Sequence, residues 1–563
     1  MRWTIKPKPE PAQIQQLAQA LNVNELIASL LLQRGITTFE EARRFFRPSL
    51  EDLHDPYLMK DMDKAVARVE KAIATGENIL VYGDYDVDGT TAVALVYSYL
   101  LGFYPNVATY IPDRYEEGYG VSYQGIDFAH DNRFSLIIAL DCGIKALEKV
   151  AYAASKGIDF IICDHHRPGQ ELPEAVAVLD PKRADCTYPY EELCGCGIGF
   201  KLVQALALTR NQTVHDLIPY LDLVVTAIAA DIVPITGENR VLAFYGLQVI
   251  NSGKRPGIRA LTHQLRKKKL TITDVVFIIA PRINAAGRIQ HGRYAVELLT
   301  ETDKEKAAAG AAAIETFNTD RKNLDREITE EALRQIEAQK AQKKYATVVY
   351  GEHWHKGVIG IVASRLIETY YRPTVVFTRS GDKLAASARS VKHFDIYSAL
   401  EACAEHVEQF GGHTYAAGLT LHTAQYEAFK EKFETVVANS IDKTHLTPEI
   451  TIDAEINLED ITPKFYRIIK QFAPFGPGNM KPVFMTRHCR DTGYARGVGE
   501  EEKHLKLTLT QNGSSPVAAI GFNLGHKLSL VAHRNPFSAV YTLAENEWNG
   551  EINLQLNLKD MKP

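Results

Sequence analysis

The stretch ILVYGDYDVDGTTAVALV, residues 79–96, decides the fold class and raises the first question about function. Its apolar start is typical of a buried strand, and its end is typical of a helix. Asp84, Asp86 and Asp88 occupy alternate positions in the loop between them. Like charges this close together must be well solvated or neutralised by cations. Taken alone, the loop fits both a polar turn closed by Gly89 and a metal-binding loop.

Apolar runs that end in polar residues recur along the following 150 or so residues, in keeping with one domain. Continuous apolar runs bounded by turns are typical of strands in a parallel sheet that is buried on both faces. Their alternation with helical stretches predicts βαβ units and an α/β fold. The runs are NILVYGD (78–84), SLIIALDCG (135–143), IDFIICDHH (158–166), AVAVLDP (175–181) and LVVTAIAAD (223–231).

Acidic and histidine side chains fall at the ends of these predicted strands, which is where α/β sheets bind ligands. Asp141 follows LIIAL, Asp164, His165 and His166 follow FIIC, and Asp231 follows AIAA. Oxygen ligands together with one imidazole favour Mn²⁺ or Mg²⁺ over a thiolate zinc site. Two ions about 3.5–4 Å apart, with one carboxylate as a bridge, can activate water for displacement at phosphorus.

The composition excludes some classes of protein and leaves others open. The chain has 563 residues, 45% of them hydrophobic, and a net charge of −5, so no global basic field indicates a polyanion partner. A basic groove can nevertheless lie within a balanced total. Seven scattered cysteines indicate reduced thiols in a cytosol. The start MRWTIKPKPEPAQ has no apolar core of a signal peptide, and no apolar run reaches the length of about 18 residues that spans a membrane. We therefore expect a cytoplasmic protein.

The length suggests several domains. Residues 303–345 are rich in Ala, Glu, Lys and Arg and contain no Pro, which predicts a long helix of about 60 Å if it is unbroken. After residue 448, short alternating strands such as HLKLTLTQ predict a small β-barrel, for which an OB-like fold is one candidate. The expected segments are an N-terminal helical extension (1–75), the catalytic domain (76–302), the connecting helix (303–345), a smaller α/β domain (346–447) and the β-barrel (448–563).

The motifs, taken together, resemble one known family. GDYDVDG, LDCG, DHH and AAD, in this order, are similar to the four motifs of the DHH phosphoesterase family. GVIGIVASRL, SARS and FGGHTYAAGLTL resemble its DHH-associated domain. IPDRYEEGYGVS, APRINAAGRI and FAPFGPGNMKPVF resemble segments of the bacterial single-strand-specific exonucleases within it. The resemblance covers nearly the whole chain.

The resemblance implies roles for the clustered residues. Asp141 would bridge the two ions, Asp164 would orient His165, and His166 would face the scissile phosphate. Whether Asp84 contacts metal directly or supports the other ligands is left open. The implied metal ligands are Asp84, Asp86, Asp88, Asp141, His165 and Asp231.

Substrate-binding residues are expected in both α/β domains. Glycine backbone and guanidinium groups suit phosphate recognition, and the resemblance implies that the second domain senses the terminal 5′ phosphate. Tyr119 lies between glycines, where its ring could stack on a base. One departure from the family pattern is His393, where we expect a small residue. The candidates are Arg114, Tyr119, Arg282, Asn284 and Arg288, in loops of the first domain, and Ser387, Arg389, Gly411, Gly412 and His413 in the second.

The function implied is a 5′→3′ exonuclease that degrades single-stranded DNA to 5′ mononucleotides in DNA repair and recombination. The resemblance also implies a monomer whose candidate protein partners are a helicase and a single-strand-binding protein. An alternative enzyme class is a phosphodiesterase of short oligonucleotides or cyclic dinucleotides, or a pyrophosphatase, but the extra segments argue against it. An inactive nucleic-acid-binding scaffold is a further class, and the complete set of ligands argues against that one.

Overall fold

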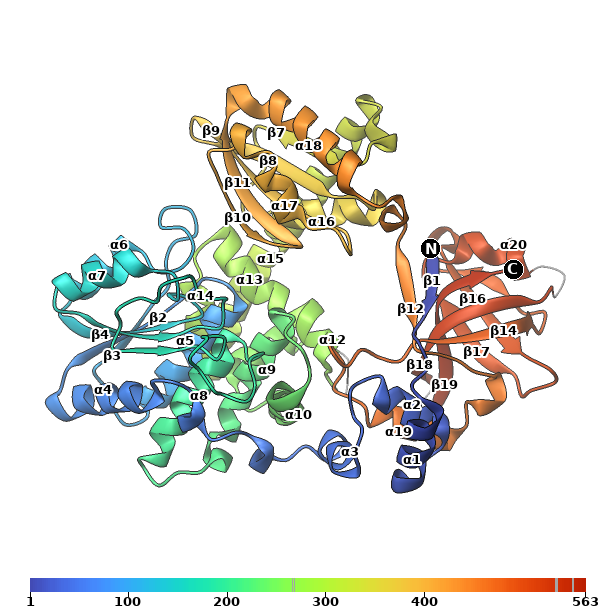
Figure 1. Cartoon of the computed structure of the whole chain (residues 1–563), viewed down its shortest axis with the longest axis horizontal. Helices are drawn as coiled ribbons and strands as arrows, with labels where there is room; N and C mark the ends of the chain where they lie inside the picture. The colour runs from blue at the N-terminus through green and yellow to red at the C-terminus, as the bar shows by residue number, and fades with distance from the viewer. Residues whose placement is uncertain (266, 268, 532–534, 549–550) are drawn as a thin grey trace.

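The computed structural model describes residues 1–563 except 266, 268, 532–534 and 549–550. Three bodies are joined by extended segments and by one long helix (Figure 1). The catalytic domain is coloured blue to green, the second α/β domain is yellow to orange, and the C-terminal module is red. None of the helices in the described part of the chain combines the length and the apolar character needed to cross a bilayer.

The catalytic domain is built on the parallel sheet that the apolar runs predict. Its strand order is β3-β2-β4-β5-β6, and every neighbouring pair is parallel. Alternate residues of β2 and β4 enter two separate hydrophobic cores, so the sheet is buried on both faces. This explains why the runs are continuously apolar. The strands are β2 (Asn78–Gly83), β3 (Val107–Tyr110), β4 (Phe134–Leu140), β5 (Asp159–Cys163) and β6 (Ala177–Leu179).

Helices cover both faces of this sheet. The larger core lies on the side of α4 (Met62–Thr75), α5 (Val87–Leu101), α8 (Gly195–Leu208) and α9 (Leu221–Ala230). The smaller core lies on the side of α6 (Tyr123–Asp131) and α7 (Leu147–Ser155). The domain continues through α10 (Gly237–Ser252), α11 (Pro256–Thr262), α12 (Ile272–Asp274), the π-helical segment η4 (Val275–Ile279), α13 (Ala280–Ile289) and α14 (Arg293–Thr300).

Two local predictions in this domain were wrong. The run at 223–231 is helix α9 rather than a strand, and nearly all of its residues are buried. A fully buried helix is apolar on every side, so periodicity cannot separate it from a buried strand. The segment APRINAAGRI is helix α13 rather than a loop. Its proline stands in the first turn, where helices tolerate proline, and its alanines favour the helix that follows.

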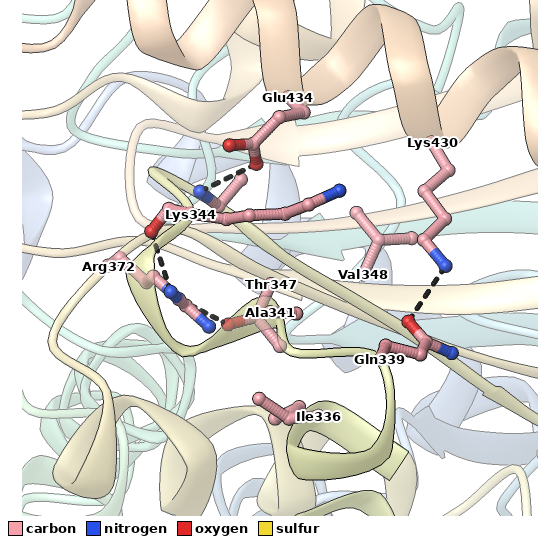
Figure 2. Close-up of a pocket in the computed structure, with 10 residues that line it drawn as sticks. Ile336, Gln339, Ala341, Lys344, Thr347, Val348, Arg372, Lys430 and Glu434 are labelled. Carbon is pink, nitrogen blue, oxygen red and sulfur yellow. Dashed lines mark hydrogen bonds between the residues drawn. The ribbon is translucent and has the colours of Figure 1, made fainter.

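The connecting helix α15 (Lys304–Ala338) is continuous over 35 residues, about 52 Å at 1.5 Å per residue. Asp303 caps it by accepting hydrogen bonds from the backbone N–H groups of Glu305 and Lys306, both at 2.9 Å. Neither Gly310 nor the segment 318–320 interrupts it, and it ends before the expected residue 345. Its C-terminal end joins the second domain, where Lys430 donates to Gln339 and Arg372 donates to the carbonyl oxygen of Lys344 (Figure 2).

The second domain has a five-stranded sheet of order β10-β11-β9-β8-β7, in which only β7 and β8 are parallel. Its hydrophobic core lies between this sheet and its helices. The elements are β7 (Thr347–Gly351), α16 (Ile359–Thr369), β8 (Thr374–Ser380), β9 (Lys383–Arg389), α17 (Ile396–Glu401), β10 (Gln409–His413), β11 (Ala416–His422) and α18 (Tyr426–Ser440).

The C-terminal module is a seven-stranded sheet of order β13-β14-β18-β19-β17-β16-β15, with a further β14–β16 pairing. The predicted strand HLKLTLTQ is present as β16. The elements are β12 (Glu449–Ile452), β13 (Ala454–Glu455), α19 (Pro463–Lys470), β14 (Phe484–Asp491), β15 (Arg496–Val498), β16 (His504–Thr510), β17 (Val517–Gly521), α20 (Leu528–Val531), β18 (Phe537–Trp548) and β19 (Glu551–Lys562).

The N-terminal segment divides between two bodies instead of forming one extension. Strand β1 (Arg2–Ile5) pairs in parallel with β12, and Trp3 donates to Asp560 at 2.9 Å. Helices α1 (Pro11–Leu21), α2 (Glu25–Leu32) and α3 (Phe39–Phe46) share one hydrophobic core with the C-terminal module (Figure 1). Helix α4 packs into the catalytic domain. The first strand and helices of the chain therefore pack against its C-terminal module and stabilise it.

Candidate active site

The loop after β2 places its three aspartates by helix capping and by hydrogen bonds. Asp86 is the N-cap of α5, and its side chain accepts from the backbone N–H of Gly89 at 3.1 Å. Asp88 accepts from the N–H groups of Gly195 and Cys196 at 2.6 and 2.7 Å. These two donors open α8, whose N-terminal end favours a carboxylate. The loop is therefore fastened to two helices.

Asp141 lies at the centre of the cluster, directly after β4. Its backbone has a φ of 59°, which is the left-handed region and uncommon for a residue with a side chain. A side chain on Gly195 would place its Cβ 2.5 Å from the Cβ of Asp141, so only glycine permits this approach. Oδ1 of Asp141 is buried and has no hydrogen-bond partner. This oxygen is thus held free for another ligand.

His165 joins the aspartates into one cluster. Its Nε2 atom lies 3.2 Å from Oδ1 of Asp141, 3.6 Å from Oδ2 of Asp88 and 3.6 Å from Oδ2 of Asp231. Asp231 reaches this place from the C-terminal end of helix α9, not from a strand. Three carboxylates around one imidazole nitrogen form a candidate cation site.

Potential ligand atoms within 4.8 Å of one another fall into overlapping sets. Asp141 belongs to two of these sets. Oδ2 of Asp84 is also buried without a hydrogen-bond partner, like Oδ1 of Asp141. The orphaned oxygens and the oxygen-rich donor set fit hard divalent cations. The sets are Asp84 with Asp86 and Asp141, Asp88 with His165 and Asp231, and Asp141 with His165 and His166.

The raised pKa values of the clustered carboxyl groups also indicate that this site needs positive charge to balance them. Burial, followed by the charge of Asp86, raises the pKa of Asp88 to about 7. Burial, followed by the charge of Asp88, raises the pKa of Asp231 to about 8. The pKa values of Asp84 and Asp141 are also well above their ordinary range for the same reasons. Cations at this position would remove the repulsion.

The two histidines have opposite electrostatic character. Burial, and then the charge of His166, lowers the pKa of His165 to about 3, so His165 is neutral and able to bind metal. Burial also lowers the pKa of His166, but the hydrogen bond to Asp164 outweighs it and brings the pKa to about 9. His166 is therefore protonated at neutral pH in this structure.

Asp164 orients His166 rather than the ring of His165. Its Oδ1 lies 2.7 Å from Nδ1 of His166 and accepts from the backbone N–H groups of both histidines, while Oδ2 accepts from the N–H of Ile144 at 2.9 Å. Burial raises the pKa of Asp164, but its bond to His166 lowers it to about 2 overall. The expectation that Asp164 positions the imidazole of His165 was wrong, because the backbone turns the two rings to different neighbours.

Tyr119 lies beside the cluster with its ring 53% exposed. Its hydroxyl donates to the carbonyl oxygen of Asp141 at 3.2 Å and lies 3.2 Å from Nε2 of His166. The ring packs edge-on against His166. Tyr119 is thus anchored at its hydroxyl and leaves a ring face available.

Three predicted arginines converge between the catalytic and second domains. The guanidinium of Arg114 lies 4.3 Å from the ring centre of Tyr85. Arg288 is half-buried and donates to the carbonyl oxygen of Gly357 at 2.7 Å, and desolvation together with the charges of Arg114 and Arg389 lowers its pKa to about 9. Within the described part of the chain, none of the three arginines has an ion pair. We call Arg114, Arg288 and Arg389 the arginine pocket.

The second domain contributes the other side of this pocket. Arg389 donates to Oγ of Ser387 at 3.0 Å, and a Cβ at Gly360 would lie 2.9 Å from both side chains. His413 ends β10, and its pKa is lowered by burial and by the charges of Arg389 and His166. Gly411 and Gly412 precede it on the same strand.

The two other predicted substrate residues on α13 are Arg282 and Asn284. Arg282 donates to Glu315 at 2.5 Å and to the carbonyl oxygen of Ile278 at 2.8 Å, so its side chain is directed to α15. Asn284 lies on the same helix, and among the described residues its side chain has no hydrogen bond. The substrate-binding role of Arg282 stays a prediction, because its side chain is paired with Glu315 on α15 and lies apart from the other three arginines.

Sequence reasoning assigned no role to Asp180 and Lys182. Asp180 follows β6, is fully buried with Oδ2 unpaired, and has a pKa raised by burial to about 7. Lys182 donates to the carbonyl oxygen of His165 at 2.7 Å. The run AVAVLDP ends in an aspartate like the other strands, and that signal could have identified Asp180. The pocket in Figure 2, by contrast, shares no residue with the cluster, and hydrogen bonds join its own residues, Arg372 to Thr347 and Ala346 to Glu434.

Removal of divalent ions is expected to destabilise the protein, more at about pH 8.5 than at about pH 6. In the folded state, Asp88 keeps its proton up to about pH 7 and Asp231 keeps its proton up to about pH 8. In the unfolded chain, aspartate carboxyl groups lose their protons at about pH 3.9. The folded chain therefore binds more protons in this window, and its stability falls as the pH rises. His166, with a raised pKa, acts in the same direction. Bound cations reverse the effect by favouring the ionised carboxylates.

The measurement is the melting temperature in EDTA and in Mn²⁺ at both pH values. We expect several degrees of loss in EDTA at the higher pH and recovery with Mn²⁺. A metal-free melting temperature that is the same at both pH values, with no change on adding Mn²⁺, would contradict the expectation.

Comparison with known proteins agrees with this geometry. Three family models match the chain: the DHH family, N-terminal domain, over residues 78–228, the DHHA1 domain over 342–439 and the RecJ OB domain over 452–560. The single-stranded-DNA-specific exonuclease RecJ of Escherichia coli is 32% identical over 96% of this chain and 96% of its own length. The chain belongs to the RecJ family. RecJ of Bacillus subtilis is 36% identical over 100% of this chain and 70% of its own length.

Solved RecJ structures share the architecture. RecJ from Thermus thermophilus in complex with Mn²⁺ aligns with a TM-score of 0.84 and 26% identity, over 100% of this chain and 79% of that chain. An exonuclease RecJ bound to manganese aligns with a TM-score of 0.61 and 32% identity, over 71% of this chain and 99% of that chain. The predicted fold class, an α/β protein with a DHH catalytic domain, a long helix, a DHH-associated domain and an OB domain, is confirmed.

Proposed function

We propose that this chain is a metal-dependent exonuclease that hydrolyses single-stranded DNA. The observation that carries the proposal is that Asp141 joins two sets of potential metal ligands beside a pocket of unpaired arginines. RecJ relatives are named single-stranded-DNA-specific exonucleases, and RecJ from Thermus thermophilus has been solved with Mn²⁺ and with Mg²⁺. We infer that this chain uses Mn²⁺ or Mg²⁺ as well.

The ligands divide naturally between two ions. Asp84 and Asp86 would hold one ion with Asp141, and Asp88, His165 and Asp231 would hold the other. When bound, such ions lower the pKa of water and neutralise charge on a phosphoryl group. Asp141 would bridge them, because it belongs to the first set and its unpaired Oδ1 lies 3.2 Å from Nε2 of His165 in the second. The free oxygen of Asp84 favours direct contact with metal.

His166 is the candidate for contact with the scissile phosphate. Asp164 holds its Nδ1 proton, so Nε2 is the atom that can donate to a phosphoryl oxygen or to the leaving group. Nε2 is 3.2 Å from the hydroxyl of Tyr119, which fixes the plane of the ring. The raised pKa keeps this donor protonated at neutral pH.

The arginine pocket would bind the 5′-terminal phosphate and set the 5′→3′ direction. Arg389 and Ser387 present a guanidinium and a hydroxyl from one strand, and Arg114 and Arg288 face them from the catalytic domain. Guanidinium groups bind phosphate through charge-assisted hydrogen bonds, and no carboxylate among the described residues forms an ion pair with these three. A strand held at its 5′ phosphate would release 5′ mononucleotides one at a time.

The C-terminal module would bind the rest of the strand. Tyr494 is 77% exposed, and Phe522 is exposed with its ring edge-on to His504. Exposed rings on an OB fold serve as stacking platforms for bases. We further propose that the protein is a cytoplasmic monomer that acts in DNA repair and recombination. Its proposed protein partners are a helicase and a single-strand-binding protein. The expected boundaries of the catalytic, second and C-terminal domains are also proposed.

Substrates of different form separate this function from its alternatives. The protein is incubated with Mn²⁺ and with 5′-labelled single-stranded, blunt duplex and dinucleotide substrates, and separately with a cyclic dinucleotide whose products are separated by chromatography. We expect labelled mononucleotide as the first product from the single strand and little product from the duplex. Faster hydrolysis of dinucleotides than of long single strands would indicate a short-substrate phosphodiesterase. Binding of the single strand without metal-dependent cleavage would indicate a scaffold.

A further inference from the structure

A polar cavity lies apart from the cluster of candidate metal ligands, on the side of α13 where Arg282 points. Its volume is about 520 Å³. It is formed by η4 and α13 of the catalytic domain, the middle of α15, and Arg365 from α16 of the second domain. Its lining shares no residue with the metal cluster or the arginine pocket. It is therefore a separate site with walls from three parts of the protein.

The cavity carries an excess of positive charge. Five cationic side chains line it, against only the carboxylates of Asp325 and Glu330. Arg282 is paired with Glu315, and Arg365 lies 3.6 Å from Asp325. In the described part of the chain, the remaining three cations have no ion pair. These three are Arg321, Lys322 and Arg326.

Arg321 and its neighbours are polar groups at a position where a helix normally presents apolar ones. The buried face of α15 is otherwise made of alanine and isoleucine, but in its middle it carries Asn318, Arg321 and Asp325. Arg321 is 9% exposed, and its hydrogen bond is to Asn318 at 2.7 Å. Oδ1 of Asp325 and Oγ1 of Thr329 are buried without partners. Unpaired buried polar groups are costly, which indicates a ligand that completes them.

The aromatic part of the cavity points to the same kind of ligand. Phe277 is 73% exposed, although it is one of the largest apolar side chains. It lies on the five-residue π-helical segment η4. Short π-helical segments are rare and occur frequently at functional sites. An exposed ring beside cationic side chains suits a heterocyclic base next to a phosphate.

We propose that this cavity binds a nucleotide. Arg321, Lys322 and Arg326 bind the phosphate, Phe277 stacks on the base, and Asp325 accepts from an amino group of the base. The cavity volume lies within the range of small-molecule sites, about 300–1,000 Å³. Because Arg365 comes from the second domain, an occupied cavity links that domain to the catalytic domain.

The test counts the sites for deoxyadenosine monophosphate by calorimetry on the full chain in EDTA. We expect two sites per chain, one in the arginine pocket and one in this cavity. Arg321→Gln and Arg326→Gln should each weaken the cavity site by about tenfold or more, since a hydrogen bond to a charged group contributes about 1.5–3 kcal/mol. Arg389→Gln should weaken only the other site. Arg334→Gln, an exposed arginine of the same helix outside the cavity, serves as the matched control.

Several outcomes would overturn the proposal. One is binding that Arg389→Gln removes completely while Arg321→Gln and Arg326→Gln leave it unchanged. Another is that inorganic phosphate competes for the cavity site with the same affinity as the nucleotide, because the base would then contribute nothing to binding. Arg326 is exposed, so its substitution leaves the fold intact even if Arg321→Gln lowers the melting temperature. If the arginine pocket binds no nucleotide, one site that depends on Arg321 remains. That result would count against the proposed function and would leave the nucleotide site in the cavity supported.

Discussion

Asp141→Asn is expected to lower the rate of Mn²⁺-dependent hydrolysis of single-stranded DNA by about a thousandfold or more. Asp141 belongs to the ligand set with Asp84 and Asp86, and its Oδ1 is the carboxylate oxygen closest to Nε2 of His165, which belongs to the other set. An asparagine has the same shape but replaces one anionic oxygen with a neutral group and so weakens both sets at once. Loss of several kcal/mol of metal-derived stabilisation of the transition state corresponds to this factor.

The measurement combines the hydrolysis rate with Mn²⁺ titration by calorimetry. Asp131→Asn is the matched control, because Asp131 is an exposed aspartate of the same domain outside the cluster. The control should keep wild-type activity and metal stoichiometry, while Asp141→Asn should bind fewer ions. The substitution should also raise the metal-free melting temperature, since it removes one of the repelling charges. Activity within tenfold of wild type would contradict the bridging role of Asp141.

Arg389→Gln is expected to raise the KM for 5′-phosphorylated single strands by about 10- to 100-fold. The guanidinium is half-buried beside Ser387, and no carboxylate in the described chain forms an ion pair with it. A phosphate is the natural partner for such a group, and each charge-assisted hydrogen bond contributes about 1.5–3 kcal/mol. Because this binding precedes the chemical step, kcat on saturating substrate should change much less than KM.

Comparison of substrate ends makes the test specific. A strand with a 5′ hydroxyl lacks the group that Arg389 binds, so the wild type and Arg389→Gln should have similar KM values for it. Arg379→Gln is the control, because Arg379 is exposed on the neighbouring strand β8 and is paired with Glu352. Equal effects of Arg389→Gln on phosphorylated and hydroxylated strands would show that Arg389 does not read the terminal phosphate.

Much of the catalytic domain could be predicted from local patterns. Four of the five apolar runs are strands of one parallel sheet, and the polar residues that follow β2, β4 and β5 meet at one edge. This works because neighbouring parallel strands end at the same edge, so residues distant in sequence must come together. The resemblance of the motifs to a known family added the full set of metal ligands and the nature of the second domain. The pattern of residues alone had left both open.

Other features could not be predicted because they depend on packing partners. Asp231 enters the cluster from a helix, since a run buried on all sides has no period that separates helix from strand. Arg282 and Arg288 are six residues apart on α13, about 120° around the helix, and only the position of α15 decides which one faces the second domain.

Local patterns in the sequence are enough to predict the parallel sheet, the loop with Asp84, Asp86 and Asp88, and the polar residues that follow the strands. Tertiary contacts place Asp141 in two ligand sets, hold the carboxylate of Asp88 against the start of α8, and pack the chain's first helices on its last domain. The physical reason is the range of the interactions. Strand formation follows from side chains a few positions apart, whereas the direction of a buried carboxylate is set by hydrogen bonds to segments far along the chain.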